Sequence, residues 1–99
     1  LEMDDRPEGI ITASDVLAIE VVKASNLKGI KIPSELEVIG FDDISLASIY
    51  NPSITTIAQP KYDMGAAALN MLVDLINKKE LKKKNILINP ELIIRESCP

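Results

Sequence analysis

Two short apolar runs on either side of a helical pattern constrain this chain more than any other feature of its sequence. Residues 9–13 (Gly-Ile-Ile-Thr-Ala) and 37–41 (Glu-Val-Ile-Gly-Phe) are rich in β-branched residues and are predicted as buried strands. Residues 16–28 have helical periodicity, with Ser14 or Asp15 as the N-cap. A strand, a helix and a strand in this order predict a parallel βαβ unit with a right-handed crossover.

The rest of the chain reads as a mixture of short elements. Residues 44–54 form a turn-rich stretch with room for one short helical turn, and residues 55–58 are predicted as extended. Pro60 to Lys79 has one apolar stripe and is predicted as an amphipathic helix. Two apolar triplets, 86–88 and 92–94, are predicted as strands on either side of a turn. The fold class is therefore α/β.

Composition excludes several classes of function. The net charge is −4 and the pI is about 4.7, whereas binding to nucleic-acid phosphates requires a basic face. The chain has no His and a single Cys, Cys98, so a Ser–His or Cys–His pair, a His metal ligand and an internal disulfide are excluded. We expect no cofactor. Because the sequence starts at Leu1 without an initiator Met, we also expect a piece of a longer protein.

Polar residues follow both predicted strands of the βαβ unit. Ser14 and Asp15 come after the first strand, and Asp42 and Asp43 come after the second. Ligands of open parallel sheets bind at the carboxyl ends of the strands, so these side chains are candidates for a binding site. We expect Asp42 to contact a ligand, Asp15 to cap the helix and Asp43 to cap a turn. Two alternatives stay open, a general acid–base pair and a site for a hard cation.

Two further residues have competing interpretations. Phe41, the only Phe, either packs in the core or lines a ligand pocket. Gln59 stands between an extended segment and a helix, where it either caps the helix or reaches a ligand across a hinge.

Five segments of the chain form a recognisable series: TASDVLA (12–18), PSELEVIGFDD (33–43), PSITTIAQP (52–60), MG (64–65) and LIIRES (92–97). Together they resemble the lactose/galactose-repressor (LacI/GalR) family of bacterial transcription regulators. Each segment alone is a weak signal, whereas five in the same order and spacing are specific. The resemblance covers essentially the whole chain.

The resemblance implies a periplasmic-binding-protein-like fold of two subdomains, present here as a C-terminal fragment. Residues 9–58 would belong to the C-terminal subdomain, about 60–88 would supply a helix and strand of the N-terminal subdomain, and about 90–99 would return. The extended segments around 56–59 and 89–92 would then be hinge crossings.

The resemblance also implies roles for individual residues. Family contacts with the effector fall on Ser14, Phe41, Asp42 and Gln59. The family's homodimer interface falls on the helix after Asp15 and on the following stretch, at Val16, Leu17, Glu20, Ile44, Leu46, Ala47 and Tyr50.

The function implied is the effector-binding and dimerisation portion of a cytoplasmic repressor whose effector is a sugar or a nucleoside. Operator DNA would be bound only by a separate helix-turn-helix headpiece, and neither a membrane partner nor a catalytic activity is expected. One alternative is a fragment of a periplasmic sugar-binding protein of an uptake system. Another is an enzyme that uses Asp15, Asp42 and Asp43 with a metal.

Overall fold

The computed structural model describes residues 4–80 and 84–99, and the chain divides into two compact units. The first unit contains the residues up to Ala58 together with Leu92–Pro99, and the second contains Gln59–Glu91. The chain passes from the first unit to the second after Ala58 and returns to the first after Glu91. The assignment of these parts to the subdomains of a longer protein stays a prediction.

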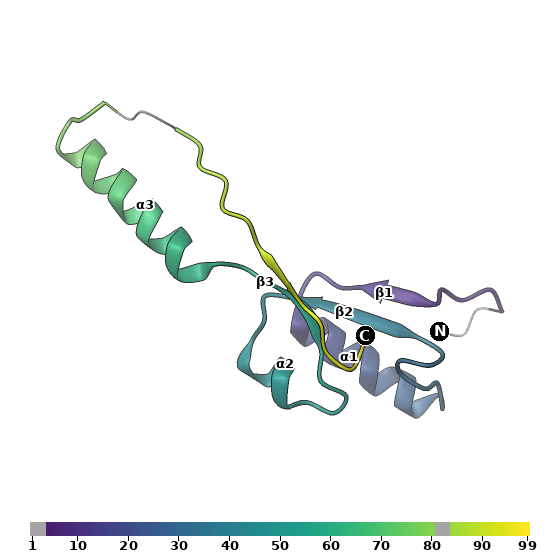
Figure 1. Ribbon diagram of the computed structural model, residues 1–99. Helices are drawn as coiled ribbons and strands as arrows, with labels where there is room; N and C mark the ends of the chain where they lie inside the picture. The colour runs from purple at the N-terminus through teal and green to yellow at the C-terminus, as the bar shows by residue number, and fades with distance from the viewer. Residues whose placement is uncertain (1–3, 81–83) are drawn as a thin grey trace. The chain divides into compact units, whose positions relative to one another are not determined.

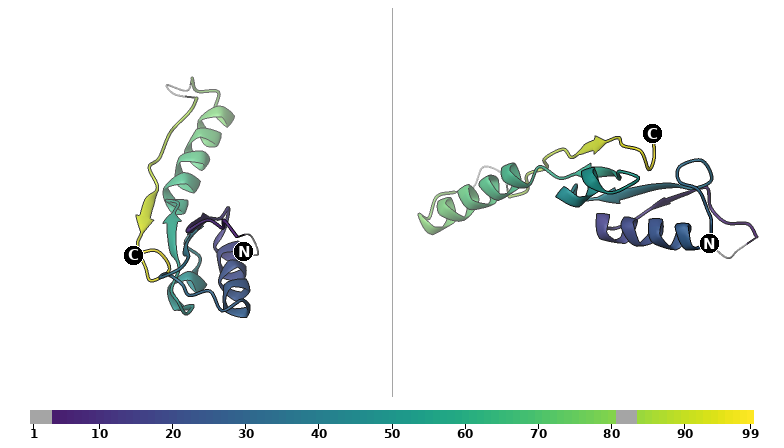
Figure 2. Two further views of the ribbon diagram at one scale, coloured as in Figure 1. Left: turned by 90° about the vertical axis from the view of Figure 1, so that its right-hand side faces the viewer. Right: turned by 90° about the horizontal axis from the view of Figure 1, so that it is seen from below.

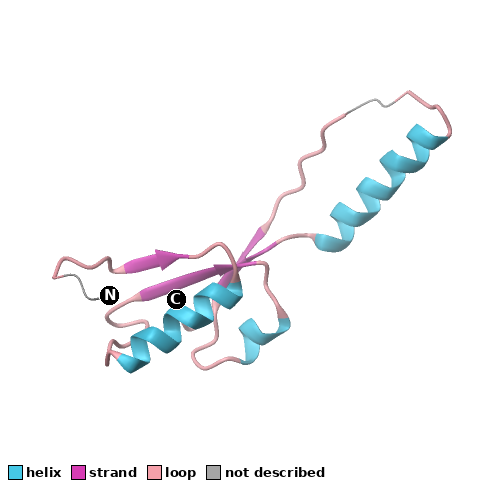
Figure 3. Ribbon diagram, turned by 180° about the vertical axis from the view of Figure 1, so that it is seen from behind, coloured by secondary structure: helices cyan, strands magenta, loops and turns pink. Residues whose placement is uncertain are grey.

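A four-stranded sheet with the order β1-β2-β3-β4 forms the first unit's framework. Its strands are β1 (Gly9–Ile11), β2 (Glu37–Phe41), β3 (Thr55–Ala58) and β4 (Glu91–Ile93). Both described strand pairings, β1 with β2 and β2 with β3, are parallel, and the arrowheads of β1 and β2 point the same way in Figure 3. The first three strands therefore deliver their carboxyl ends to one edge of the sheet.

Helix α1 (Asp15–Leu27) connects β1 to β2 and packs against β2, as Figures 1 and 2 show. It begins where predicted because Ser14 is its N-cap, with the Ser14 hydroxyl oxygen accepting a hydrogen bond from the Leu17 amide at 3.2 Å. The predicted parallel βαβ unit is confirmed.

The hydrophobic core lies between α1, the sheet and a short helix, α2 (Ser45–Ile49). Its fully or almost fully buried members are aliphatic, as the scarcity of aromatic residues requires: Ala18, Ile19, Val22, Leu36, Val38, Ala47 and Ile54. The apolar arc of α1 is wider than this core uses, since the side chains of Val16 and Leu17 are 58% and 50% exposed.

The C-terminal segment is fastened to the sheet through Ser97, which is fully buried. The Ser97 hydroxyl donates to the carbonyl of Val38 in β2 at 2.6 Å and accepts from the amide of Thr55 in β3 at 2.8 Å. One side chain thereby satisfies a buried carbonyl and a buried amide on neighbouring strands.

The second unit contains α3 (Lys61–Ile76), which confirms the predicted amphipathic helix but ends three residues before the predicted end at Lys79. Its apolar stripe and the segment after it line a groove, formed by Met64, Ala67, Ala68, Met71, Ile86, Leu87 and Ile88. The predicted strand over 86–88 is wrong, because these residues join no sheet in the described part of the chain and Leu87 is 98% exposed. The second predicted strand forms as β4, shifted by one residue.

Candidate functional site

The sheet edge predicted to bind a ligand lies where β1 and β2 end and α1 begins. Strand pairing continues past β1, with the Thr12 amide donating to the Ile39 carbonyl at 2.9 Å. The start of α1 then lies against the end of β2, since an ideal Cβ on Gly40 would be 3.2 Å from the Cα of Asp15. Three of the four predicted effector residues, Ser14, Phe41 and Asp42, are therefore placed at one edge by the backbone.

Asp42 is the first residue beyond β2, and its backbone is unusual. Its φ is 106° and that of Asp43 is 55°, so two successive residues other than glycine have positive φ. The Asp42 amide donates to the Ile57 carbonyl at 2.9 Å, which fastens this turn to β3. Non-glycine residues in such conformations are concentrated at binding sites.

The expected role of Asp15 as a helix cap is wrong. Asp15 is the first residue of α1 and is fully buried. One carboxyl oxygen accepts from the Ile44 amide at 2.8 Å, and the other accepts from the Thr56 hydroxyl at 2.6 Å. The helix is capped by Ser14, so Asp15 is available to connect the start of α1 to the turn after β2 and to β3.

Asp43 does not act as a simple turn cap either. Its carboxylate forms an ion pair with Arg95 at 2.8 Å. Its amide donates to the Thr56 hydroxyl oxygen at 3.3 Å. Asp43 therefore connects the turn to the C-terminal segment and to β3.

The effector contacts predicted for Phe41 and Gln59 stay predictions, although the structure places both residues. Phe41, the last residue of β2, is half-buried and pairs in register with Ile57. Gln59 follows β3 directly and is the first residue of the second unit, so its part in an effector site stays a prediction.

Two residues of the site were missed by the sequence interpretation. Thr56 is fully buried and bonds to both Asp15 and Asp43, and Arg95 is the ion-pair partner of Asp43. Thr56 resembles any strand threonine in the sequence, and Arg95 lies 52 positions from Asp43 along the printed chain. The one sequence signal for Arg95 is that it is the single basic residue after Pro90.

The three aspartates do not form a metal site. Both oxygens of Asp15 accept hydrogen bonds from protein groups, and the Asp43 carboxylate is paired with Arg95. Within residues 4–80 and 84–99, no three His, Cys, Asp or Glu side chains are grouped so as to hold a metal ion.

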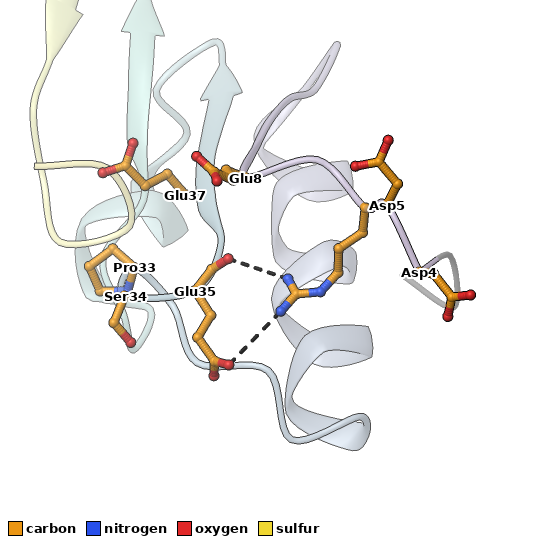
Figure 4. Close-up of a pocket in the computed structure, with 8 residues that line it drawn as sticks. Asp4, Asp5, Glu8, Pro33, Ser34, Glu35 and Glu37 are labelled. Atoms are coloured by element: carbon orange, nitrogen blue, oxygen red, sulfur yellow. Dashed lines mark hydrogen bonds and ion pairs between the residues drawn. The ribbon is translucent and has the colours of Figure 1, made fainter.

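A separate acidic cavity of about 660 Å³ lies at the other end of the sheet, where β1 and β2 begin (Figure 4). Arg6 crosses it to reach Glu35, donating to its backbone carbonyl at 3.3 Å and approaching its carboxylate at 3.9 Å. The cavity is lined by Asp4, Asp5, Arg6, Glu8, Pro33, Ser34, Glu35 and Glu37. It includes none of the predicted effector residues.

Two titrating groups near the C-terminus have shifted pKa values. The backbone amide and then the hydroxyl of Ser53 lower the pKa of Glu96 by hydrogen bonding to its carboxylate. Burial, followed by the hydrogen bond and the charge of Glu37, raises the pKa of the Cys98 thiol. Neither group belongs to the predicted effector site.

Residues 1–98 match the family described as "Periplasmic binding protein-like domain". The chain belongs to this family. The resemblance to lactose/galactose-repressor-type regulators is confirmed by the relatives of this periplasmic binding protein-like domain, which are transcription regulators.

Three relatives show the extent of the similarity. The HTH-type transcriptional regulator RegA of Clostridium saccharobutylicum is 42% identical over 97 residues, which are 98% of this chain and 29% of that protein. The ribose operon repressor of Halalkalibacterium halodurans is 39% identical with the same coverage. The crystal structure of a periplasmic binding protein/LacI transcriptional regulator from Alkaliphilus metalliredigens, complexed with D-xylulofuranose, has a TM-score of 0.84 and 30% identity over 93% of this chain and 35% of that one.

The domain spans 29% of the length of the two curated relatives. The activity and the partners of a whole regulator are therefore proposals for this chain. No helix among the described residues has the length and apolar character needed to cross a membrane.

Proposed function

We propose that this chain is the effector-binding and dimerisation portion of a bacterial transcriptional repressor, in which Asp42 binds a hydroxyl group of a sugar. The observation that supports this most directly is the position of Asp42. It is the first residue beyond a central parallel strand, on a turn whose backbone is held at positive φ. A carboxylate at such an edge accepts hydrogen bonds from the hydroxyl groups of a polyol.

Other features of the edge support the same role. Ser14 uses its hydroxyl oxygen as an acceptor in capping α1, so its hydroxyl proton stays available to a ligand acceptor. Phe41 is half-buried and offers a ring edge or face to an apolar side of a sugar. We propose that Gln59 also contacts the effector.

The names of the relatives support a pentose as the first probe. One relative is a ribose operon repressor, and one solved relative is complexed with D-xylulofuranose. We propose that the chain itself has no catalytic role and that operator DNA is bound by a separate headpiece in a cytoplasmic protein, in agreement with the net charge of −4.

Dimerisation is proposed through the exposed face of α1 and the adjoining α2. Val16 and Leu17 are exposed there, Leu46 is 42% exposed, and Glu20 is exposed beside them. Ile44 and Tyr50 are half-buried against this chain's own core, while Ala47 is fully buried in that core and is not part of an exposed surface. Apolar patches of several hundred Å² on a soluble chain mark an interaction surface.

The test of this function is a calorimetric titration of the complete regulator that contains this chain with D-ribose, D-xylulose and adenosine. We expect saturable binding of at least one pentose and a change in operator affinity when it is bound. The 99-residue chain alone should give no sequence-specific shift of operator DNA at physiological salt. If none of the probes binds, the proposed effector-binding function is wrong. If the isolated chain shifts operator DNA specifically, the proposal that a separate headpiece binds the operator is wrong.

The dimer is tested separately by sedimentation velocity at micromolar concentration. We expect Leu17→Glu to shift the complete protein toward monomer, because it places a charge in the apolar patch, whereas Leu27→Glu at the end of α1 should not. A protein that stays dimeric with Leu17→Glu would place the interface elsewhere.

A further inference from the structure

The turn that carries Asp42 has a backbone that neighbouring groups must hold in place. Asp42 and Asp43 have φ values of 106° and 55°, and neither is a glycine. Such conformations are unfavourable for residues with a Cβ and persist only where surrounding contacts fix them. The contacts that fix this turn therefore also fix where the Asp42 side chain begins.

Three successive backbone amides after β2 are hydrogen-bonded. The Asp42 amide donates to the Ile57 carbonyl at 2.9 Å. The Asp43 amide donates to the Thr56 hydroxyl oxygen at 3.3 Å, and the Ile44 amide donates to a carboxyl oxygen of Asp15 at 2.8 Å. The first of these bonds continues the sheet, whereas the other two depend on side chains.

Asp15 controls both of the side-chain bonds. It accepts from Ile44 directly, and its second oxygen accepts the Thr56 hydroxyl proton at 2.6 Å. With its proton committed to Asp15, the Thr56 hydroxyl presents lone pairs to the Asp43 amide. The two bonds thus form one network that ends in a single fully buried carboxyl group.

The carboxyl group of Asp15 lies directly against Gly40 of β2. Gly40 is buried in β2 immediately before Phe41, and a Cβ at that position would collide with an oxygen of Asp15. The absence of a side chain at position 40 lets Asp15 reach Ile44 and Thr56. The close approach of the strand and the helix start therefore requires glycine at position 40.

We infer that Asp15 is a positioning residue of the effector site: it fixes the Asp42–Ile44 turn, directly and through Thr56, and so sets the direction from which Asp42 meets the effector. This inference rests on the proposed function, in which Asp42 contacts the effector. Asp15 itself is fully buried, and both of its carboxyl oxygens accept hydrogen bonds from protein groups.

Three variants of the complete regulator separate this role from a general effect on stability. Asp15→Ala removes both acceptors. Asp15→Asn keeps one oxygen for the Ile44 amide, and Thr56→Val keeps the shape of the strand while removing the hydroxyl. Asp5→Ala, at an exposed aspartate of the same unit, is the matched control.

The first readout is amide hydrogen exchange, which needs no effector. We expect Asp15→Ala to speed exchange at Asp43 and Ile44 by about tenfold or more, with peptides from α1 and from β2 before Gly40 changed by less than about twofold. Asp15→Asn should restore protection at Ile44, and Thr56→Val should expose Asp43 alone. Exchange that is unchanged at the turn, or faster everywhere by the same factor, would overturn the inference. If Asp15→Ala fails to fold, the pattern with Thr56→Val decides.

The second readout is the affinity for D-ribose or D-xylulose, measured with and without Asp42→Asn. We expect Thr56→Val to weaken binding by about tenfold in the unmodified background and by less than about twofold once Asp42 is replaced, because its effect is transmitted through Asp42. Equal losses in the two backgrounds would overturn the inference. Failure of the unmodified protein to bind either pentose would count against the proposed function, while the exchange pattern would still decide the role of Asp15.

Discussion

Arg95 and Asp43 form an ion pair in which Nη1 of Arg95 lies 2.8 Å from Oδ1 of Asp43. The same nitrogen donates to the carbonyl of Ile54, immediately before β3, at 3.1 Å. Both side chains are partly buried. The pair joins the turn after β2 to the segment after β4, so two parts of the chain that are distant in sequence meet beside the candidate effector site.

Removing this pair should destabilise the fold without distorting the turn. Asn tolerates positive φ, so Asp43→Asn removes the charge and leaves the backbone acceptable. We expect the free energy of unfolding in urea to fall by about 1 kcal/mol. This loss lies between the contribution of an exposed ion pair and that of a buried hydrogen bond to a charged group. Arg95→Met should lower it further because the bond to Ile54 is also lost. A double-mutant cycle that shows purely additive effects would mean that the two residues do not interact.

The buried hydroxyl of Ser97 gives a second prediction. Ser97→Ala leaves the Val38 carbonyl and the Thr55 amide without their partner in a buried place. We expect a loss of about 2–3 kcal/mol in the free energy of unfolding. Ser48→Ala, which removes an exposed hydroxyl bonded within α2, should change it by less than about 0.5 kcal/mol. Equal effects of the two substitutions would show that Ser97 does not fasten the C-terminal segment.

Two glycines should respond to alanine in opposite directions. Gly40→Ala forces a Cβ into the Asp15 carboxyl group, and we expect a loss of several kcal/mol, on the scale of an overpacked core. Gly65 lies within α3 with no atom near its ideal Cβ, so Gly65→Ala should raise the free energy of unfolding by about 0.5–1 kcal/mol. Thermal and urea unfolding measure both changes. A neutral Gly40→Ala would contradict the close approach of β2 and α1.

The lowered pKa of Glu96 should make the stability of the fold depend on pH in the acid range. The Ser53 amide and hydroxyl bond to its carboxylate at 3.1 and 2.9 Å and lower its pKa from the ordinary value of 4.5. The unfolded chain therefore binds this proton at a higher pH than the folded chain does. The ionised Glu96 carboxylate therefore contributes its full stabilisation at a pH above its ordinary pKa. This contribution disappears as the pH falls through the lowered pKa of the folded state.

The variant Glu96→Gln should consequently be less stable than the unmodified protein at about pH 7 and equal to it in strong acid. Urea midpoints measured across the acid range give the comparison. Glu80→Gln, at an exposed glutamate after α3, serves as the control. A stability difference between Glu96→Gln and the unmodified protein that grows as pH falls would contradict the hydrogen bonds assigned to Glu96.

Local patterns were sufficient to predict the βαβ unit. The β-branched runs at 9–13 and 37–41 and the cap at Ser14 are short-range signals, and each survives in the structure because burial of an apolar face agrees with local preference. The triplet at 86–88 has the same local composition as a strand. It forms none in the described residues because a strand also needs a neighbour to pair with, which periodicity does not reveal.

The role of Asp15 illustrates what sequence patterns leave out. An aspartate at a helix start is most simply a cap or a charge favourable to the helix dipole, and both are local explanations. Its actual partners, Ile44 and Thr56, are 29 and 41 positions away. The space it occupies depends on Gly40, on a neighbouring strand. A contact that depends on three distant positions has no local signature.

The central claim is that Asp42 binds the effector, and one calorimetric titration tests it most directly. Asp42→Asn in the complete regulator is compared with Asp5→Asn, an identical change at an exposed site of the same unit. We predict that Asp42→Asn weakens binding of the pentose by about tenfold or more while operator affinity stays unchanged, because a hydrogen bond to a charged acceptor contributes about 1.5–3 kcal/mol. Unchanged pentose affinity in Asp42→Asn would contradict the assignment of the site.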